Sequence, residues 1–128
     1  MSYFLAKTDP ETYSLDDLER EKQTVWDGVK NPQALRALRQ MAPGDHVFIY
    51  HSGGQAAVVG LARVTAAGDP APQFRFVSRL DPPATLAEIK QSRLFDDWAL
   101  VRQGRLSTMA APEAFVAWMR ARYPAADI

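Results

Sequence analysis

Residues 44–64 read GDHVFIYHSGGQAAVVGLARV. They contain two apolar runs, 46–51 and 56–64, that are rich in valine, isoleucine and aromatic residues, and residues 52–55 join them with two glycines. Two such runs on either side of a glycine-rich link predict a β-hairpin. Apolar side chains occur at both odd and even positions, so we expect both faces of the hairpin to be covered in the middle of a closed sheet.

Weaker signals on either side predict the remaining elements. Strands are expected at 3–7, 24–26, 74–80 and 106–109, with Asp81-Pro82-Pro83 ending the third of these. Helices are expected after Ser14 as far as about Glu21, after Asn31-Pro32, and over 86–92 and 112–123, with a further turn at 94–98. Short strands with helices inserted between them and one helix at the end favour an α+β domain with a partly closed β-barrel of about five or six strands.

The bulk composition limits the class of protein. The 128 residues are 47% apolar, which suffices for one domain, residues 1–128, whose core needs no disulfide or metal. The chain has no cysteine, which excludes disulfides, thiolate nucleophiles and cysteine-ligated zinc. Residues 1–5 carry no basic region and no long apolar run follows them, so we expect a cytoplasmic protein without a signal peptide or membrane segment.

The charge balance bears on how nucleic acid can be bound. The 15 basic and 15 acidic residues cancel at pH 7, whereas a protein that holds nucleic acid by its phosphate backbone alone needs a positive excess. Acidic residues gather in 1–21, while basic residues outnumber acidic ones in 22–63 and 102–122. A basic face and an ordinary solvated surface both fit this distribution.

The chemistry of an enzyme is largely missing. His46 and His51 are an odd number of residues apart on one predicted strand, so they point to opposite faces and cannot share a metal. The sequence has no glycine-rich phosphate loop and no nucleophile elbow. The adjacent pairs Asp16-Asp17 and Asp96-Asp97 are typical of helix starts. We therefore favour a binding protein and expect no catalytic residue, metal or cofactor.

Four segments, taken in order, resemble the EVE domain family. They are YFLAKTDP at 3–10, WDGVKNPQA at 26–34, GDHVFIYHS at 44–52 followed by VGLA at 59–62, and LVRQGRLS at 100–107. Each segment is a weak signal, but their order and spacing cover nearly the whole chain. The sequence departs from the family pattern at Phe4, where tryptophan is usual, at Thr8-Asp9 in place of Ser-Glu, and at Lys30 in place of arginine.

This resemblance implies a PUA-like barrel with a pocket for a modified base in DNA or RNA. Methylated or hydroxymethylated cytosine are the leading candidates, and nucleic acid carrying such a base is the expected partner. A separate nuclease or modification-system protein is a second candidate partner. We expect a monomer that binds no membrane.

The candidate site combines the resemblance with residue chemistry. An extruded base needs an aromatic surface for stacking and polar groups for its edge. The expected ligand-binding residues are Trp26, Tyr50, His51, Ser52, Asn31, Lys7, Thr8, Arg105 and Ser107, with Lys30 and Arg36 as phosphate ligands.

Several of these residues have a competing structural role. Trp26 can be a core residue, Asn31 can be the N-cap of the helix that begins at Pro32, and His51 can be a hydrogen-bonded structural histidine. Two other functions also stay open. The same pocket can belong to a small enzyme acting on a nucleotide or metabolite, or the last helix can expose Trp118 and Met119 to a protein partner.

Overall fold

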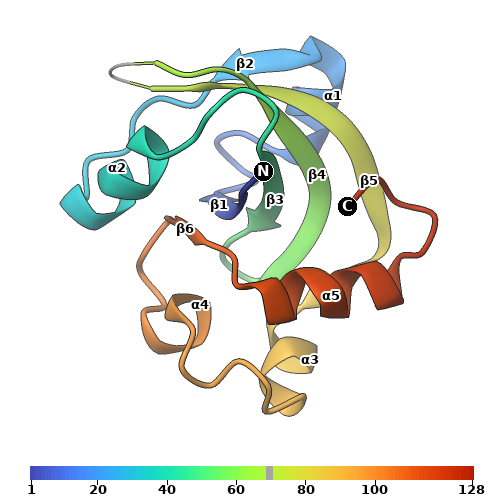
Figure 1. Ribbon diagram of the computed structural model, residues 1–128. Helices are drawn as coiled ribbons and strands as arrows, with labels where there is room; N and C mark the ends of the chain where they lie inside the picture. The colour runs from blue at the N-terminus through green and yellow to red at the C-terminus, as the bar shows by residue number, and fades with distance from the viewer. Residues whose placement is uncertain (69–70) are drawn as a thin grey trace.

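The computed structural model describes residues 1–68 and 71–128. In this part of the chain six strands form one curled sheet with the order β2-β5-β4-β3-β1-β6. The strands are β1 (Tyr3–Thr8), β2 (Gln23–Val25), β3 (His46–His51), β4 (Ala57–Ala66), β5 (Gln73–Thr85) and β6 (Thr108–Ala110). The helices are α1 (Leu15–Glu21), α2 (Pro32–Arg39), α3 (Leu86–Gln91), α4 (Ala99–Arg102) and α5 (Glu113–Arg122). Figure 1 shows the sheet bent into a half-barrel, which confirms the predicted α+β, partly closed barrel.

The predicted hairpin lies at the centre of this sheet. β3 pairs with β4 in antiparallel fashion and with β1 in parallel fashion, and all six of its residues are buried. Because the sheet is covered on both faces, its central strand cannot alternate apolar and polar residues. This position explains the uninterrupted apolar run at 47–50 within the strand.

The predicted end of the third strand is wrong, because β5 continues through Asp81-Pro82-Pro83 to Thr85. The pairing of β5 with β4 is interrupted there: Gly60 pairs with Arg79 and Val58 pairs with Ala84, so residues 80–83 have no partner on β4. A proline without an N–H costs a strand nothing where no ladder bond is made. The short helix α4 was also not predicted.

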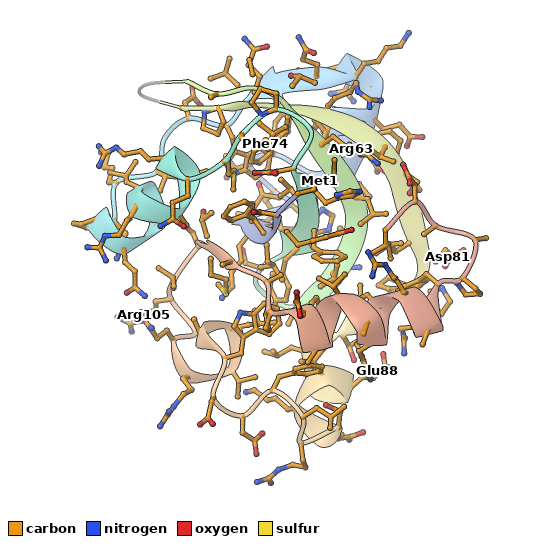
Figure 2. The ribbon with its side chains drawn as sticks, in the orientation of Figure 1. Met1, Arg63, Phe74, Asp81, Glu88 and Arg105 are labelled. Atoms are coloured by element: carbon orange, nitrogen blue, oxygen red, sulfur yellow. The ribbon has the colours of Figure 1, made fainter. Side chains whose placement is uncertain are left out.

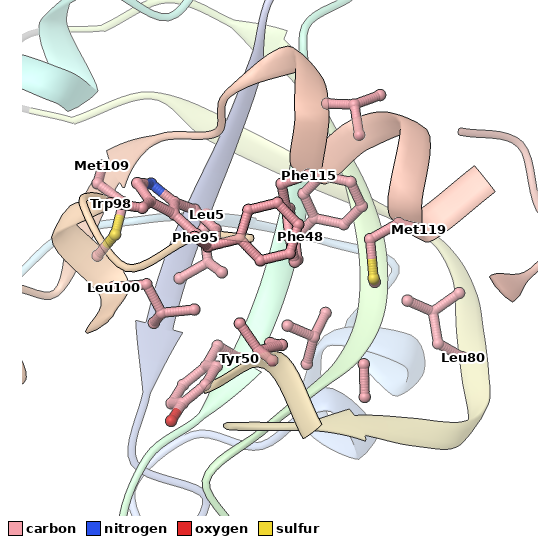
Figure 3. Packing of buried hydrophobic residues seen from close by; sticks show 14 of the residues in the cluster. Leu5, Phe48, Tyr50, Leu80, Phe95, Trp98, Leu100, Met109, Phe115 and Met119 are labelled. Atoms are coloured by element: carbon pink, nitrogen blue, oxygen red, sulfur yellow. The ribbon is translucent and has the colours of Figure 1, made fainter. Parts of the chain in front are cut away.

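The two faces of the sheet are covered by different parts of the chain. The C-terminal core contains Phe48, Phe95, Trp98, Phe115 and Met119, and Figure 3 shows their side chains packed together. The N-terminal core packs α1 and α2 against the other face and contains Phe4, Leu15, Leu38, Trp26 and Phe74. His46 stacks on Tyr3, while His51 contacts α1, so the two histidines lie on opposite faces as predicted.

Local signals position α1 and α2 on the N-terminal core. Ser14 and Asp17 form a capping box at the start of α1, as the sequence indicates. Gly60 allows α1 to approach the sheet closely, since a Cβ atom there would lie 2.6 Å from the Leu15 side chain. Asn31 caps α2, and Pro32 occupies its first turn.

Candidate functional site

Two adjoining cavities lie where β1 ends, beside the segment that leads from β2 to α2. Their volumes are about 450 Å³ and about 380 Å³. Five residues line both cavities: Thr8, Thr12, Trp26, Asp27 and Gly28. We call the two cavities together the Trp26 hollow. The first cavity adds Tyr13, Thr24 and Val25, and the second adds Lys7, Asp9, Val29, Lys30, Asn31 and Ser107.

Packing from behind fixes the indole of Trp26. The side chain is only 7% exposed. Its ring stacks on Phe74, with centroids 4.9 Å apart, and meets the Tyr13 ring edge-on at 6.1 Å. No described residue accepts a hydrogen bond from its Nε1. Trp26 is therefore a core residue, as one interpretation of the sequence expected, and it also borders the hollow.

The structure brings six of the predicted residues together around the second cavity. They come from three parts of the chain: Lys7 and Thr8 at the end of β1, Trp26, Lys30 and Asn31 before α2, and Ser107 before β6. The Lys7 Nζ donates to the Gly104 carbonyl at 3.0 Å, which ties the loop before β6 to the rim. Burial holds the pKa of the Lys7 ammonium below its ordinary value.

Asn31 serves mainly as a helix cap. Its Oδ1 accepts from the backbone N–H groups of Gln33 and Ala34 at 2.9 and 3.1 Å. The amide Nδ2 donates to no described residue, so a donor is left at the edge of the hollow. Gly28 shapes the same segment through its left-handed backbone, with φ at +83°.

The strand end at Tyr50, His51 and Ser52 does not line the Trp26 hollow. Tyr50 is buried in the C-terminal core, where burial raises the pKa of its phenol. The His51 Nε2 accepts from the Leu15 N–H at 3.0 Å, and its Nδ1 donates to Gln55 Oε1 at 2.8 Å. Both ring nitrogens are thus engaged within the protein.

Strand pairing explains why this strand end is closed. β1 runs parallel to β3, with Thr8 opposite His51, so the ends of both strands lie side by side. The Ser52 N–H and hydroxyl both donate to the Thr8 carbonyl, at 2.9 and 3.3 Å. These bonds hold β1 and the hairpin together, and Ser52 lines neither cavity of the hollow.

Two predicted basic residues lie outside the hollow but close to it. Arg105 is exposed in the loop before β6, next to Gly104, and Figure 2 shows it at the surface near α4. Arg36 lines a separate groove of about 280 Å³ between α2 and β6. Lys30 lies on the rim of the hollow itself.

Eight lining residues of the hollow were not among the predicted site residues: Asp9, Thr12, Tyr13, Thr24, Val25, Asp27, Gly28 and Val29. Tyr13 is held by its hydroxyl, which donates to Glu21 Oε1 at 2.6 Å, and burial together with this bond raises its pKa to about 12. The Thr8 hydroxyl donates to the Tyr13 carbonyl at 2.6 Å, which closes the turn between β1 and α1. Four of the eight, Asp9, Asp27, Gly28 and Val29, lie in the segments that resemble the EVE family.

Other kinds of site receive no support from the described residues. Within 1–68 and 71–128, histidine and acidic side chains form no group of three that could hold a metal ion. No helix in the same ranges has the length and apolar character needed to cross a membrane. One alternative was that the last helix exposes Met119 to a protein partner. Instead, α5 packs Phe115 and Met119 into the C-terminal core.

Comparisons with known proteins identify related chains. A family model described as the EVE domain matches residues 2–121. Rat thymocyte nuclear protein 1 is 40% identical over 75 residues, which cover 49% of this chain and 33% of the rat protein. The match therefore spans about a third of the curated relative's length.

Solved structures share the whole fold. A crystal structure of a Pseudomonas putida protein has a TM-score of 0.85 and 31% identity, and the match covers 94% of this chain and 99% of that one. Human THYN1 in complex with DNA containing 5-methylcytosine has a TM-score of 0.84 and 23% identity, with 95% and 97% covered.

These relatives correct one expectation, the cytoplasmic location. The curated relatives from rat, mouse and human are all named as nuclear proteins. The absence of cysteine suits any reducing compartment, the nucleus included, so it carried no information that could separate the two.

Proposed function

This chain belongs to the EVE domain family, and from that membership we propose that it is a non-catalytic module that binds DNA carrying a modified base. The base leaves its strand and enters the Trp26 hollow. Cytosine carrying a methyl or hydroxymethyl group at its 5-position is the expected ligand. RNA carrying the same base is the second possible ligand, and the binding panel described below includes it.

The observation that carries the proposal is a rigid indole beside an open cavity. Extruding a base costs a few kcal/mol, and stacking on an aromatic ring returns about 1–3 kcal/mol. Because Phe74 and Tyr13 already hold the Trp26 ring, little side-chain freedom is lost when a base stacks on it. Hydrogen bonds to the base edge must supply the remainder.

The polar groups around the hollow suit a cytosine. Asp27 is exposed on the rim, and a carboxylate can accept from the exocyclic amino group of cytosine. The Nδ2 of Asn31 can donate to a ring nitrogen or to the carbonyl oxygen. The Ser107 hydroxyl lies 3.4 Å from that of Thr108, a weak contact that a ligand can replace.

A member of the same family supports the choice of ligand. Human THYN1 is described in complex with DNA that contains 5-methylcytosine. At 23% identity that structure establishes a shared fold. The transfer of its ligand to this chain is our inference, and the placement of the base beside Trp26 rests on the geometry of the hollow alone.

The zero net charge suggests how affinity is divided. We assign phosphate contacts to Lys30, Arg36 and Arg105. Three such contacts to a single strand correspond to a slope of about −2 when the logarithm of affinity is plotted against the logarithm of salt concentration. Selectivity then comes from the hollow, and unmodified DNA binds weakly.

A binding panel tests this function. Oligonucleotides of one sequence carry 5-methylcytosine, 5-hydroxymethylcytosine, N6-methyladenine or no modification, as DNA and as RNA, and affinity is measured by fluorescence polarisation. We expect preference for a modified cytosine, and loss of that preference in Trp26→Ala, with folding verified by circular dichroism. Equal affinity across the panel, or unchanged selectivity in a folded Trp26→Ala protein, would overturn the proposal.

The same samples test the non-catalytic assignment. Mass spectrometry of the oligonucleotides after long incubation should recover every base unchanged. A modified product formed by the wild-type protein would favour the enzyme alternative.

A further inference from the structure

A second concave surface lies next to the Trp26 hollow. It is the groove of about 280 Å³ between α2 and β6, which we call the α2 groove. Its floor contains the buried side chains of Leu106 and Met109. Gln33 and Arg36 of α2 and Gln40, which follows the helix, form one wall, and all three are exposed.

The hollow and the groove share no lining residue, but neighbouring residues line them on both walls. Ser107 lines the hollow, while Leu106 and Thr108 on either side of it line the groove. On the opposite wall Asn31 lines the hollow, and Gln33, two residues later, lines the groove. Residues one or two positions apart in sequence have Cα atoms within about 7 Å of each other, so the two spaces adjoin along both walls.

Three of the cations around these spaces form no ion pair with any described side chain, although Asp9 and Asp27 line the same hollow. Six other arginines form ion pairs, namely Arg20, Arg63, Arg79, Arg93, Arg102 and Arg122, whereas Arg39, Arg75 and Arg120 form none within the part of the chain that the structure describes. Among the described residues, Lys30, Arg36 and Arg105 form none. Cations that are left unpaired around a hollow and an adjoining groove suit a polyanion that passes along both.

The groove also offers hydrogen-bonding groups of the kind that read base edges. The side-chain amides of Gln33 and Gln40 bond to no other described residue. Each amide presents a donor and an acceptor together. Glutamine can pair with a base through both groups, while Leu106 and Met109 beneath provide an apolar surface for the base plane.

We propose that the α2 groove binds the nucleotide next to the extruded base on the same strand. The neighbouring base lies over Leu106 and Met109, Gln33 and Gln40 contact its edge, and Arg36 contacts the phosphate between the two nucleotides. Recognition then depends on the identity of one flanking base. This inference rests on the proposed function, because the extruded base sets the register of the strand.

The test uses 5-methylcytosine DNA in which one neighbour is abasic, so that the base is missing but the phosphate remains. Three probes are compared: both neighbours present, the 5′ neighbour abasic, and the 3′ neighbour abasic. For the wild-type protein we expect an affinity loss of about tenfold with one of the two abasic probes and little change with the other.

Variants assign that dependence to the groove. Gln33→Ala/Gln40→Ala should abolish the difference between the probes, because the contacts to the flanking base are gone. Arg36→Gln should weaken binding to all three probes by a similar factor. Lys90→Gln, on the exposed face of α3, is the matched charge control and should behave as wild type.

The outcomes separate this inference from the proposed function. Equal affinity for all three probes, or a flank dependence that survives the double variant, overturns the inference while leaving selectivity for 5-methylcytosine intact. A protein that shows the flank dependence but does not distinguish 5-methylcytosine from cytosine retains the groove assignment and loses the proposed function.

Discussion

Two tryptophans, Trp26 and Trp98, are almost equally buried, at 7% and 9% exposure, yet they stand in different environments. Trp98 belongs to the C-terminal core, with its ring centroid 4.5 Å from that of Phe115, and its Nε1 donates to the Ala110 carbonyl at 2.9 Å. Trp26 has a similar aromatic neighbour in Phe74, but it borders an open hollow, and its Nε1 bonds to no other described residue.

The comparison shows that two almost equally buried tryptophans differ in their surroundings, and we propose that only Trp26 binds a base. What separates them is whether every polar atom of the side chain is satisfied within the protein and whether space remains beside the ring. Trp98 meets the description of a structural residue. Trp26 meets the description of a preformed wall.

The largest expected effect is on stability at Trp98. Trp98→Ala removes an indole from a closed aromatic cluster, so the free energy of unfolding should fall by about 3–5 kcal/mol. Urea denaturation followed by circular dichroism measures it. A loss under about 1 kcal/mol would mean that the C-terminal core is less closed than the contacts of Trp98 indicate.

A pair of phenylalanine substitutions sharpens the comparison. Trp98→Phe leaves the Ala110 carbonyl without its donor and should cost about 1–3 kcal/mol of stability, with affinity for 5-methylcytosine DNA unchanged. Trp26→Phe shrinks the stacking surface and should lower that affinity by about tenfold at a smaller cost in stability. If both variants lose affinity equally, the two tryptophans do not differ in role.

Two glycines provide a control for backbone strain. Gly28 borders the hollow with φ at +83°, while Gly53 turns the hairpin with φ at +81°, and a Cβ atom would meet no neighbour at either. Alanine should cost about 1–2 kcal/mol at each position. Only Gly28→Ala should also weaken binding, by severalfold in the polarisation assay. A matching loss in Gly53→Ala would show that the effect is global.

Asn31→Asp separates the two roles of that side chain. The carboxylate keeps the acceptor that caps α2 and favours the positive end of the helix, so thermal stability should stay the same or rise by a few tenths of a kcal/mol. The donor at the hollow is lost, so affinity should fall. Retained affinity would confine Asn31 to capping.

The smallest effect concerns pH. Burial lowers the pKa of Lys7, so its ammonium loses its proton at a lower pH than an exposed lysine does. Affinity for nucleic acid should therefore decline as pH rises through that lowered pKa, while folding, which favours the neutral amine at this position, is not weakened. Lys7→Arg should remove the decline, because arginine stays charged. The same alkaline decline in Lys7→Arg would assign it to another group.

The sequence predicted the parts of this fold that local chemistry specifies. The apolar run at 46–51, the capping residue Ser14 and the Asn31-Pro32 helix start depend on near neighbours, and each prediction was confirmed. The continuation of β5 through Pro82 depends on an interruption in its pairing with β4, which a single strand's sequence does not reveal.

The candidate site divides in the same way. Trp26, Lys30 and Asn31 lie within six consecutive residues, so the covalent chain itself keeps them near one another. His51 was expected to face a ligand, but the parallel pairing of β1 with β3 brings α1 onto its ring, and only the tertiary structure shows this. Thr12 and Tyr13 reach the hollow through a turn whose sequence has no periodic signal.

The most direct test follows the indole N–H signals by ¹H–¹⁵N NMR during titration with an oligonucleotide containing 5-methylcytosine, with each signal assigned from a phenylalanine variant. The Trp26 signal should shift in proportion to saturation, while that of Trp98 stays in place, and the unmodified oligonucleotide should move neither at the same concentrations. Saturable binding that leaves the Trp26 signal unmoved would contradict the claim that the base lies beside this ring.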